Sequence, residues 1–310
     1  MQTTDNLSGN CIATVTTDSF IPGTLVTIDS FLRRNPWFTG DVIVFYNELD
    51  AGYKSCLSGL SSKIKFLRVN PQLQARINEV IKVFPEFTSR QARFYSLETF
   101  RLRSYGKVLF CDSDLLFRQS IEDLFRLGQP LIACGDGAHY NNRGRRWGTV
   151  PDESISSQAA DIALRNTFNS GLFLVDNTLL TEEHYAGLLN LVDSGIYKTP
   201  NMKLADQVVL NLYFAGQQHL VSATYNYLLA HRAPINESEK VSLLDARVLH
   251  FNGRYKPWLA HEVLQKGLEE PAFIKACGFW FESYLDCIQR LHLKKVVQTQ
   301  EDARASGQSK

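Results

Sequence analysis

The chain has 310 residues, of which 44% are hydrophobic and 21% charged, a composition typical of a soluble globular protein with at least one large domain. Its 33 Lys and Arg residues nearly balance 32 Asp and Glu residues, and a net charge of +1 lacks the basic excess that marks proteins with nucleic-acid partners. The first residues lack the layout of a secretory signal, and no apolar run approaches the length of a transmembrane segment, which predicts a cytoplasmic protein.

Strands and helices alternate in the first part of the chain. The predicted elements are a strand at 11–16, a helix at 22–33, a strand at 42–46, a helix at 51–60, a strand at 64–69, a helix at 90–103 and a strand at 108–110. Because strands that alternate with helices form a sheet covered on both faces, the fold class is α/β. We expect a Rossmann-like, mostly parallel mixed sheet flanked by helices.

The second part of the chain is less regular. It predicts a strand at 130–134, a loop at 135–148, a strand at 168–176, helices at 181–191 and 205–214, and a last strand at 247–249. We expect residues 1–10 to be a flexible N-terminus, residues 11–294 to form one domain, and the polar tail at 295–310 to be disordered.

Two carboxylates follow the strand at 108–110, and an imidazole follows the strand at 247–249. A helix cap or a solvated turn would explain Asp112 or Asp114 alone, and a buried histidine would explain His250. Ligands of α/β sheets, however, bind beyond the carboxyl ends of the strands. Two carboxylates and one imidazole predict a divalent cation, and they suit Mn²⁺ better than Mg²⁺ because imidazole is the softer ligand.

Two further pairs of residues have both a structural and a functional interpretation. Gly253 and Lys256 form either a plain surface turn or a site for a diphosphate, since glycine lets backbone N–H groups approach an anion and lysine adds a charge. Asp206 and Gln207 open a predicted helix, where an aspartate is commonly a cap or a partner of the helix dipole.

Five segments in order resemble glycosyltransferase family 8, the group that contains glycogenin, galactinol synthase and bacterial lipopolysaccharide galactosyltransferases. The similarity spans residues 11–258 and includes Ala-Thr-Val-Thr-Thr-Asp-Ser-Phe at 13–20, the strand and aspartates at 108–114, Phe-Asn-Ser-Gly at 168–171, Asp206 and Gln207 with Asn211, and His-Phe-x-Gly-x-x-Lys-Pro-Trp at 250–258. The resemblance implies a GT-A fold, Mn²⁺, a UDP-sugar donor and transfer with retention of anomeric configuration.

The resemblance also implies a role for each matching residue. These roles are metal ligation for Asp112, Asp114 and His250, diphosphate contacts for Gly253 and Lys256, uridine and ribose contacts for Thr16, Thr17, Asp18 and Phe20, and donor-sugar contacts for Asn169, Asp206 and Gln207. Because UDP leaves as an anion, the metal and Lys256 would neutralise its charge. Asp206 and Gln207 are the catalytic candidates, since an oxygen from either would stabilise positive charge on the sugar.

One position departs from the family pattern, and one loop suggests an acceptor site. Family members often carry Lys or Arg where this chain has Ser96, so we expect Arg90 or Arg93 of the same predicted helix to supply that charge. In the loop at 135–148, Tyr140 and Trp147 predict acceptor recognition, because aromatic faces pack on sugar rings, with a merely solvated loop as the alternative.

The main hypothesis is a metal-dependent retaining hexosyltransferase that uses UDP-glucose or UDP-galactose. The acceptor would be a hydroxyl of a glycan, a polyol or a protein, and the oligomeric state stays open. The alternatives are a non-catalytic nucleotide-sugar-binding protein, against which the intact Asp112, Asp206 and Lys256 argue, and a sugar nucleotidyltransferase. Residues 13–20 lack the Gly-rich, basic phosphate loop that a nucleotidyltransferase uses.

Overall fold

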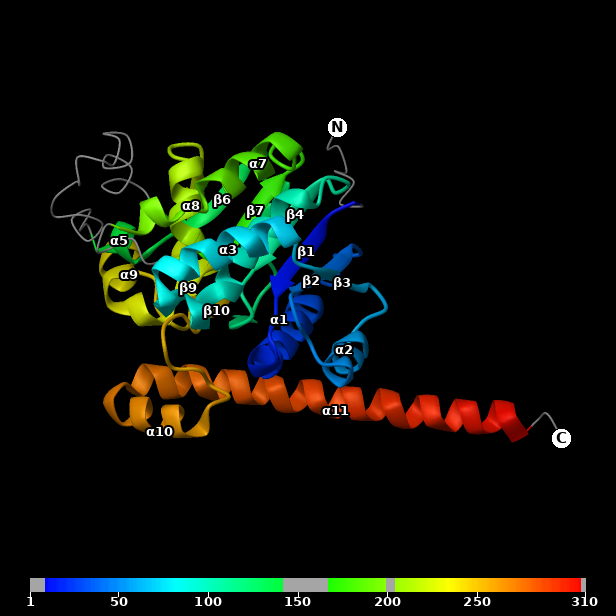
Figure 1. The fold of residues 1–310 in the computed structure, drawn as a ribbon. Helices are drawn as coiled ribbons and strands as arrows, with labels where there is room; N and C mark the ends of the chain where they lie inside the picture. Colours follow the sequence, from blue (N-terminus) through cyan, green and yellow to red (C-terminus); the bar gives the residue numbers. More distant parts are fainter. Residues whose placement is uncertain (1–8, 142–166, 199–203, 308–310) are drawn as a thin grey trace, which may run out of the picture.

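A mixed, mostly parallel sheet of seven strands forms the centre of the protein (Figure 1). The structure, a computed structural model, describes residues 9–141, 167–198 and 204–307. The strand order is β3-β2-β1-β4-β7-β6-β8. The strands are β1 Cys11–Val15, β2 Asp41–Tyr46, β3 Ile64–Arg68, β4 Lys107–Cys111, β6 Leu131–Gly135, β7 Phe168–Asp176 and β8 His219–Val221. Only β7 runs antiparallel to its neighbours, β4 and β6, so the predicted sheet is confirmed.

The two faces of this sheet pack into separate cores. Side chains of β1 alternate between them, with Ala13 in one core and Ile12 in the other, and Phe110 and Leu109 of β4 do the same. The first face is covered by α3 Pro71–Val83, α7 Glu182–Leu191 and α8 Asp206–Tyr213, and the second by α1 Ile21–Arg34, α2 Ala51–Ser58 and α4 Glu122–Arg126. Burial on both faces explains why the central strands are continuous apolar runs.

A second, three-stranded sheet has the order β5-β10-β9 and was not predicted. Its strands, β5 Leu115–Phe117, β9 Tyr227–Leu228 and β10 Val248–His250, are too short to show a clear alternation of side chains, although β10 lies one residue from the predicted strand at 247–249. β10 pairs antiparallel with β5, so that His250 lies opposite Leu115. Since Leu115 directly follows Asp114, this pairing brings the histidine to the aspartates.

The helices predicted at 22–33, 51–60, 181–191 and 205–214 are all present, within two residues at each end. The helix predicted at 90–103 instead belongs to a long 3-10 helix, η2 Pro85–Arg101. Residues 94–100 of η2 are all buried, so packing on every side, and not one amphipathic face, determines its conformation. The other short helices are α5 Gly137–Tyr140, α9 Arg232–Glu239, η1 Asp18–Phe20, η4 Ser194–Tyr197, η5 Ala223–Tyr225 and η6 Leu229–His231.

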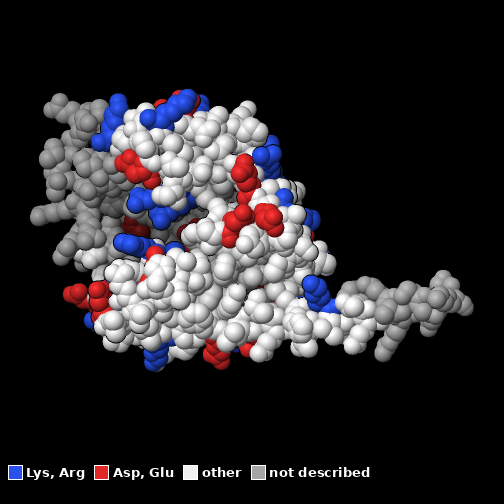
Figure 2. Space-filling view, turned by 60° about the horizontal axis from the view of Figure 1, so that its bottom comes forward, with Lys and Arg blue, Asp and Glu red and all other residues white. Residues whose placement is uncertain are grey.

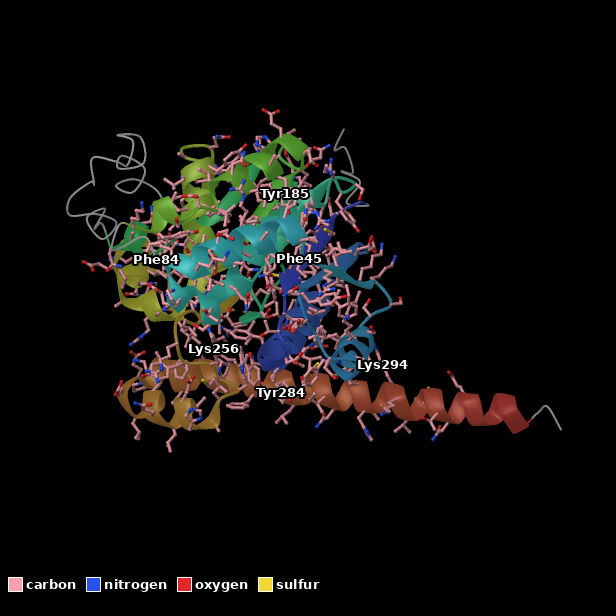
Figure 3. The ribbon with its side chains drawn as sticks, in the orientation of Figure 1. Phe45, Phe84, Tyr185, Lys256, Tyr284 and Lys294 are labelled. Atoms are coloured by element: carbon pink, nitrogen blue, oxygen red, sulfur yellow. The ribbon has the colours of Figure 1, made fainter. Side chains whose placement is uncertain are left out.

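Two further helices, α10 Ala260–Glu269 and α11 Pro271–Gly307, end the described chain. The prediction of disorder from residue 295 is therefore wrong as far as Gly307, because a helix that is nucleated in a packed segment continues through residues of high helix propensity. α11 runs along α1 and α2 and extends beyond them (Figure 1). Lys294 of α11 donates hydrogen bonds to the carbonyl oxygens of Gly59 and Leu60 after α2, at 3.1 and 3.0 Å (Figure 3). Among the described residues, no helix combines the length and the apolar character needed to cross a membrane.

Candidate active site

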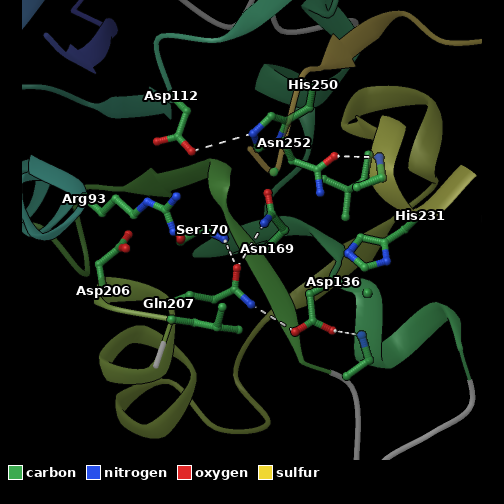
Figure 4. Close-up of a pocket in the computed structure, with 16 residues that line it drawn as sticks. Arg93, Asp112, Asp136, Asn169, Ser170, Asp206, Gln207, His231, His250 and Asn252 are labelled. Atoms are coloured by element: carbon green, nitrogen blue, oxygen red, sulfur yellow. Dashed lines mark hydrogen bonds and ion pairs between the residues drawn. The ribbon is translucent and has the colours of Figure 1, made fainter. Parts of the chain in front are cut away.

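The three predicted metal ligands meet beyond the carboxyl end of β4. Asp112 and Asp114 follow β4, His250 ends β10, and their ligand atoms all lie within 4.8 Å of one another. His250 Nε2 is 3.2 Å from Asp114 Oδ1 and 3.7 Å from Asp112 Oδ2 (Figure 4). The other ring nitrogen, Nδ1, lies 2.9 Å from Asn226 Oδ1, and this contact turns Nε2 toward the carboxylates.

Two observations show that a cation fits between these side chains. Asp114 is 5% exposed, and its Oδ1 has no hydrogen-bond partner in the described part of the chain, so buried lone pairs face this space. A Cβ atom at Gly171 of β7 would lie 2.3 Å from His250 Cε1 and 2.7 Å from Asp112 Oδ2, so only glycine leaves room for the cluster. Carboxylate oxygens with one imidazole nitrogen suit a divalent ion of the Mg²⁺ to Mn²⁺ range.

A buried lysine balances part of the negative charge. Lys256 Nζ lies 2.5 Å from Asp114 Oδ2 and 2.7 Å from the carbonyl oxygen of Phe251. Burial raises the pKa of Asp114, but the charges of Lys256 and His250 outweigh burial and hold this pKa below its ordinary value. Burial, and then the carboxylate of Asp114, raise the pKa of Asp112. The cluster therefore gains stability from any additional positive charge.

Asp206 and Gln207 occupy the first turn of α8, and both are buried. Ser96 Oγ donates a hydrogen bond of 2.7 Å to Asp206 Oδ2. Burial, and then the carboxylate of Asp112, raise the pKa of Asp206 to about 7, although hydrogen bonds from serine hydroxyls and the charge of Arg93 act in the opposite direction. Asp206 can thus change its charge near neutral pH.

The backbone immediately before Asp206 is strained. Ala205 has a φ of 51°, in the left-handed region that residues other than glycine rarely adopt. The buried hydroxyl of Tyr197 donates a hydrogen bond of 2.9 Å to the carbonyl oxygen of Ala205. This anchored turn determines where α8 begins and where Asp206 enters the site.

Arg93 supplies the positive charge that the family resemblance places at Ser96. It lines the pocket, and its charge lowers the pKa of both Asp112 and Asp206. Because residues three apart lie on the same face of a 3-10 helix, Arg93 and Ser96 of η2 point in the same direction. Of the two arginines considered, the structure places Arg93 at the site, whereas Arg90 does not line the pocket.

These residues surround a pocket of about 490 Å³. Arg93, Asp112 and Asp206 lie on one side of it, and Asp136 and His231 lie on the other (Figure 4). Figure 2 shows the hollow, with basic side chains at its rim and acidic side chains inside. An anionic ligand would therefore meet positive charge at the entrance, and a cation would find carboxylates within.

Of the residues predicted to contact the donor, Asn169, Asp206, Gln207 and Gly253 line the pocket. Gly253 has a φ of 96°, a conformation that requires glycine at this turn. Asn169 lies on β7, where its Nδ2 donates a hydrogen bond of 3.0 Å to Gln207 Oε1. The strand and the helix are thereby joined at the proposed sugar site.

The residues predicted to frame the nucleoside do not line this pocket. These residues are Thr16 and Thr17, which follow β1, and Asp18 and Phe20 of η1. The ring of Phe20 packs edge-on against Trp258, with centroids 5.3 Å apart, and lies 5.9 Å from Lys256 Nζ. The structure therefore places Phe20 beside the lysine of the cation cluster.

Two buried polar residues of the site were missed by sequence reasoning. Asp136, 2% exposed, directly follows β6 at its carboxyl end, so the signal that identified Asp112 was present for Asp136 as well. Asn226, 0% exposed, follows the short helix η5, and no pattern in the sequence distinguishes it.

Half of the predicted acceptor loop at 135–148, from residue 142 onward, lies outside the described residues, and Trp147 is in that half. Tyr140 of α5 is 4% exposed and packs in a third hydrophobic core with residues of the second sheet. Its ring cannot pack against a sugar, so this part of the acceptor prediction is wrong. Tyr140 belongs to a core although it follows a run of turn residues, a pattern typical of an exposed loop.

Several curated proteins are similar to this chain. Galactinol synthase 1 of Solanum lycopersicum is 26% identical over 195 residues, a match that covers 59% of this chain and 56% of that protein. Glycogenin-1 of Homo sapiens is 27% identical over 175 residues, covering 52% of this chain and 38% of that protein. Glycosyltransferase GlyF of Streptococcus pneumoniae is 23% identical over 178 residues, covering 55% and 38%. The chain thus spans only part of the length of these relatives.

Solved structures show the same fold. The galactosyltransferase LgtC, in complex with donor and acceptor sugar analogs, has a TM-score of 0.62 and 20% identity, covering 86% of this chain and 95% of that chain. The bifunctional glycosyltransferase WbbM has a TM-score of 0.64 and 14% identity, covering 91% and 51%. The expected GT-A fold is confirmed. A family model described as glycosyl transferase family 8 matches residues 11–262, most of the length, and the chain belongs to that family.

Proposed function

We propose that the chain is a metal-dependent, retaining glycosyltransferase that moves glucose or galactose from a UDP-sugar to a hydroxyl of a glycan, a polyol or a protein. The observation that carries this proposal is the convergence of Asp112, Asp114 and His250 within 4.8 Å, beside a pocket that holds Asp206 and Gln207. The names of similar proteins, among them galactinol synthase, glycogenin and a galactosyltransferase, support a hexose as the transferred group.

The diphosphate of the donor would bind where β4 and β10 end. A Mn²⁺ or Mg²⁺ ion held by Asp112, Asp114 and His250 would supply positive charge against the leaving diphosphate. Lys256 would exchange its contact with Asp114 for a phosphate oxygen, and the left-handed turn at Gly253 would let backbone N–H groups approach the same anion. Phe20, beside Lys256, would then border the ribose.

The hexose would occupy the part of the pocket lined by Asn169, Asp206 and Gln207. As the sugar–phosphate bond lengthens, positive charge develops on the sugar, and the carboxylate of Asp206 or the amide oxygen of Gln207 would stabilise it. Arg93 would favour the ionised form of Asp206 and would contact the donor directly. Both ends of the reacting bond would therefore meet charge of the appropriate sign.

Release of UDP from different donors tests the proposal. With Mn²⁺ present, we expect release from UDP-glucose or UDP-galactose above UDP-N-acetylglucosamine, and loss of release when a chelator is added. Asp114→Asn should lower kcat/KM by about 100-fold or more, because it weakens the cation site that stabilises the leaving group. Asp193→Asn is a matched control, because Asp193 caps η4 outside the pocket and asparagine also caps helices.

A binding protein without turnover would give a different result. It would bind the UDP-sugar with Mn²⁺ in a calorimetric titration and would release no UDP with any acceptor. Such an outcome contradicts the proposed transferase activity and leaves the donor site intact.

A further inference from the structure

Four hydrogen bonds connect the predicted metal ligand His250 to Asp136 on the other side of the pocket. His250 Nδ1 lies 2.9 Å from Asn226 Oδ1, and Asn226 Nδ2 donates to Asn169 Oδ1 at 2.9 Å. Asn169 Nδ2 donates to Gln207 Oε1 at 3.0 Å, and Gln207 Nε2 donates to Asp136 Oδ2 at 3.0 Å. These five residues come from different parts of the fold and are all buried or partly buried.

The three side-chain amides in this row of hydrogen bonds all point in the same direction. Each amide presents an acceptor oxygen on one side and a donor NH₂ on the other, so reversing a single amide would bring two donors or two acceptors face to face. Backbone groups reinforce the observed direction, since Gly171 N donates to Asn169 Oδ1 at 3.1 Å and Ser170 N donates to Gln207 Oε1 at 3.4 Å. The orientation of each amide therefore depends on the orientation of its neighbours in the row of hydrogen bonds.

Asp136 determines the direction at one end, because a carboxylate only accepts hydrogen bonds. Its Oδ1 accepts from the backbone N–H groups of Ala138 and His139, both at 2.9 Å, and from the hydroxyl of Thr167 at 2.7 Å. These donors hold the carboxylate in place. Oδ2 is thereby aimed at Gln207, which must present its NH₂ group.

At the other end, the direction of the hydrogen bonds selects the tautomer of His250. Asn226 turns its Oδ1 to His250, so Nδ1 of the imidazole must carry the proton. A neutral imidazole has one N–H, and Nε2 then presents a lone pair toward Asp114 Oδ1, 3.2 Å away. We propose that Asp136 is a positioning residue that, through three side-chain amides, keeps the proton of His250 on Nδ1 and leaves Nε2 free to bind a cation. The use of Nε2 as a metal ligand rests on the function proposed above.

The tautomer is measured by ¹⁵N NMR of the imidazoles in the full chain, without metal or donor and at a pH where His250 is neutral. Of the seven histidines, the His250 signals are those that disappear in His250→Gln. We expect the wild type to be protonated on Nδ1. In Asp136→Asn the added NH₂ group lets the direction of the hydrogen bonds reverse. His250 should then become a mixture of tautomers. Titration with Mn²⁺ should then show an affinity lower by roughly ten- to a hundredfold.

Two variants separate this role from a purely structural one. Gln207→Met keeps Asp136 and its backbone contacts but interrupts the row of hydrogen bonds. It should therefore give the same mixture of tautomers even if Asp136→Asn does not fold. Thr167→Val removes a hydrogen bond to Asp136 Oδ1 and leaves the chain intact, so His250 should stay protonated on Nδ1.

The inference is overturned if wild-type His250 carries its proton on Nε2. It is also overturned if Asp136→Asn, or Gln207→Met when that variant alone folds, keeps the Nδ1 proton and binds Mn²⁺ within twofold of the wild type. Because the tautomer is read without donor, these outcomes are independent of transfer. A protein that shows the expected tautomers but no UDP release contradicts only the proposed function.

Discussion

Arg93 occupies the pocket in place of a basic residue at Ser96, and its charge acts on Asp206. Replacing Arg93 by Met should lower kcat/KM for the UDP-sugar by about tenfold or more, because the donor loses a cationic contact and Asp206 ionises less readily. Steady-state kinetics would measure the loss, with Arg90→Met as the control on the same helix. Adding Ser96→Arg to the Arg93 variant should restore part of the activity, since both positions face the same side of η2. An unchanged kcat/KM in Arg93→Met would contradict this role.

The raised pKa of Asp206 leads us to expect that stability depends on pH. Its pKa is about 7 in the folded protein against 3.8 ordinarily, so the folded state binds the proton more tightly than the unfolded state. This contribution to the free energy of unfolding is fully present below pH 4 and is lost as pH rises through 7. Between pH 5 and pH 8 the free energy of unfolding of the metal-free protein should fall by on the order of 2 kcal/mol more than that of Asp206→Asn, as measured by urea denaturation. Equal losses in the two proteins would show that Asp206 titrates near its ordinary pKa.

Which single residues could be predicted depended on whether they follow a recognisable strand. Asp112, Asp114 and His250 were found because each follows an apolar run that ends at the ligand-binding edge of a sheet. Asn226 could not be found, because an asparagine after a short 3-10 helix resembles any turn residue. Its role appears only when three segments far apart in the sequence are placed side by side.

Among the elements, the central strands and most helices were predictable, because burial on two faces leaves long apolar runs in the sequence. The second sheet was not, since each of its strands contains only two or three residues, too few to show a period in the sequence. The 3-10 character of η2 was also invisible, because it depends on burial of all sides by neighbours.

The position of β7 beside the cation cluster gives a prediction at Gly171. In Gly171→Ala the new methyl group would fall within 2.3 Å of His250 Cε1 and 2.7 Å of Asp112 Oδ2, so the imidazole and the carboxylate must move apart. We expect Mn²⁺ affinity, measured by titration with UDP present, to fall by roughly tenfold or more. Gly128→Ala is the matched control, because a Cβ there meets no atom within 4 Å. Normal affinity in Gly171→Ala would mean that the ligands are not held in this arrangement.

For the molecule as a whole, the proposed donor site makes Lys256 a link between the nucleotide and the cation. Its ammonium neutralises Asp114, and in the proposed complex a phosphate would attract it away, so Mn²⁺ and UDP should each strengthen binding of the other. In Lys256→Met, Mn²⁺ alone should bind about tenfold more tightly than in the wild type, whereas UDP in the presence of Mn²⁺ should bind more weakly. Calorimetric titrations of both proteins measure these changes, with the exposed Lys82→Met as a control.

The decisive comparison is Mn²⁺ without nucleotide, because UDP also brings phosphate oxygens to the metal. Should Lys256→Met and the wild type bind Mn²⁺ alone with equal affinity, the lysine does not compete for Asp114, and the coupling must have another source.

The three-residue periodicity of η2 affects how related proteins are compared. A charge that is displaced by three positions along such a helix still points into the same cavity, so evolution can relocate it without losing its effect. An alignment that compares one column at a time would record Ser96 as the loss of a functional residue. Homologues that lack the expected basic residue should therefore be inspected one turn upstream before they are classified as inactive.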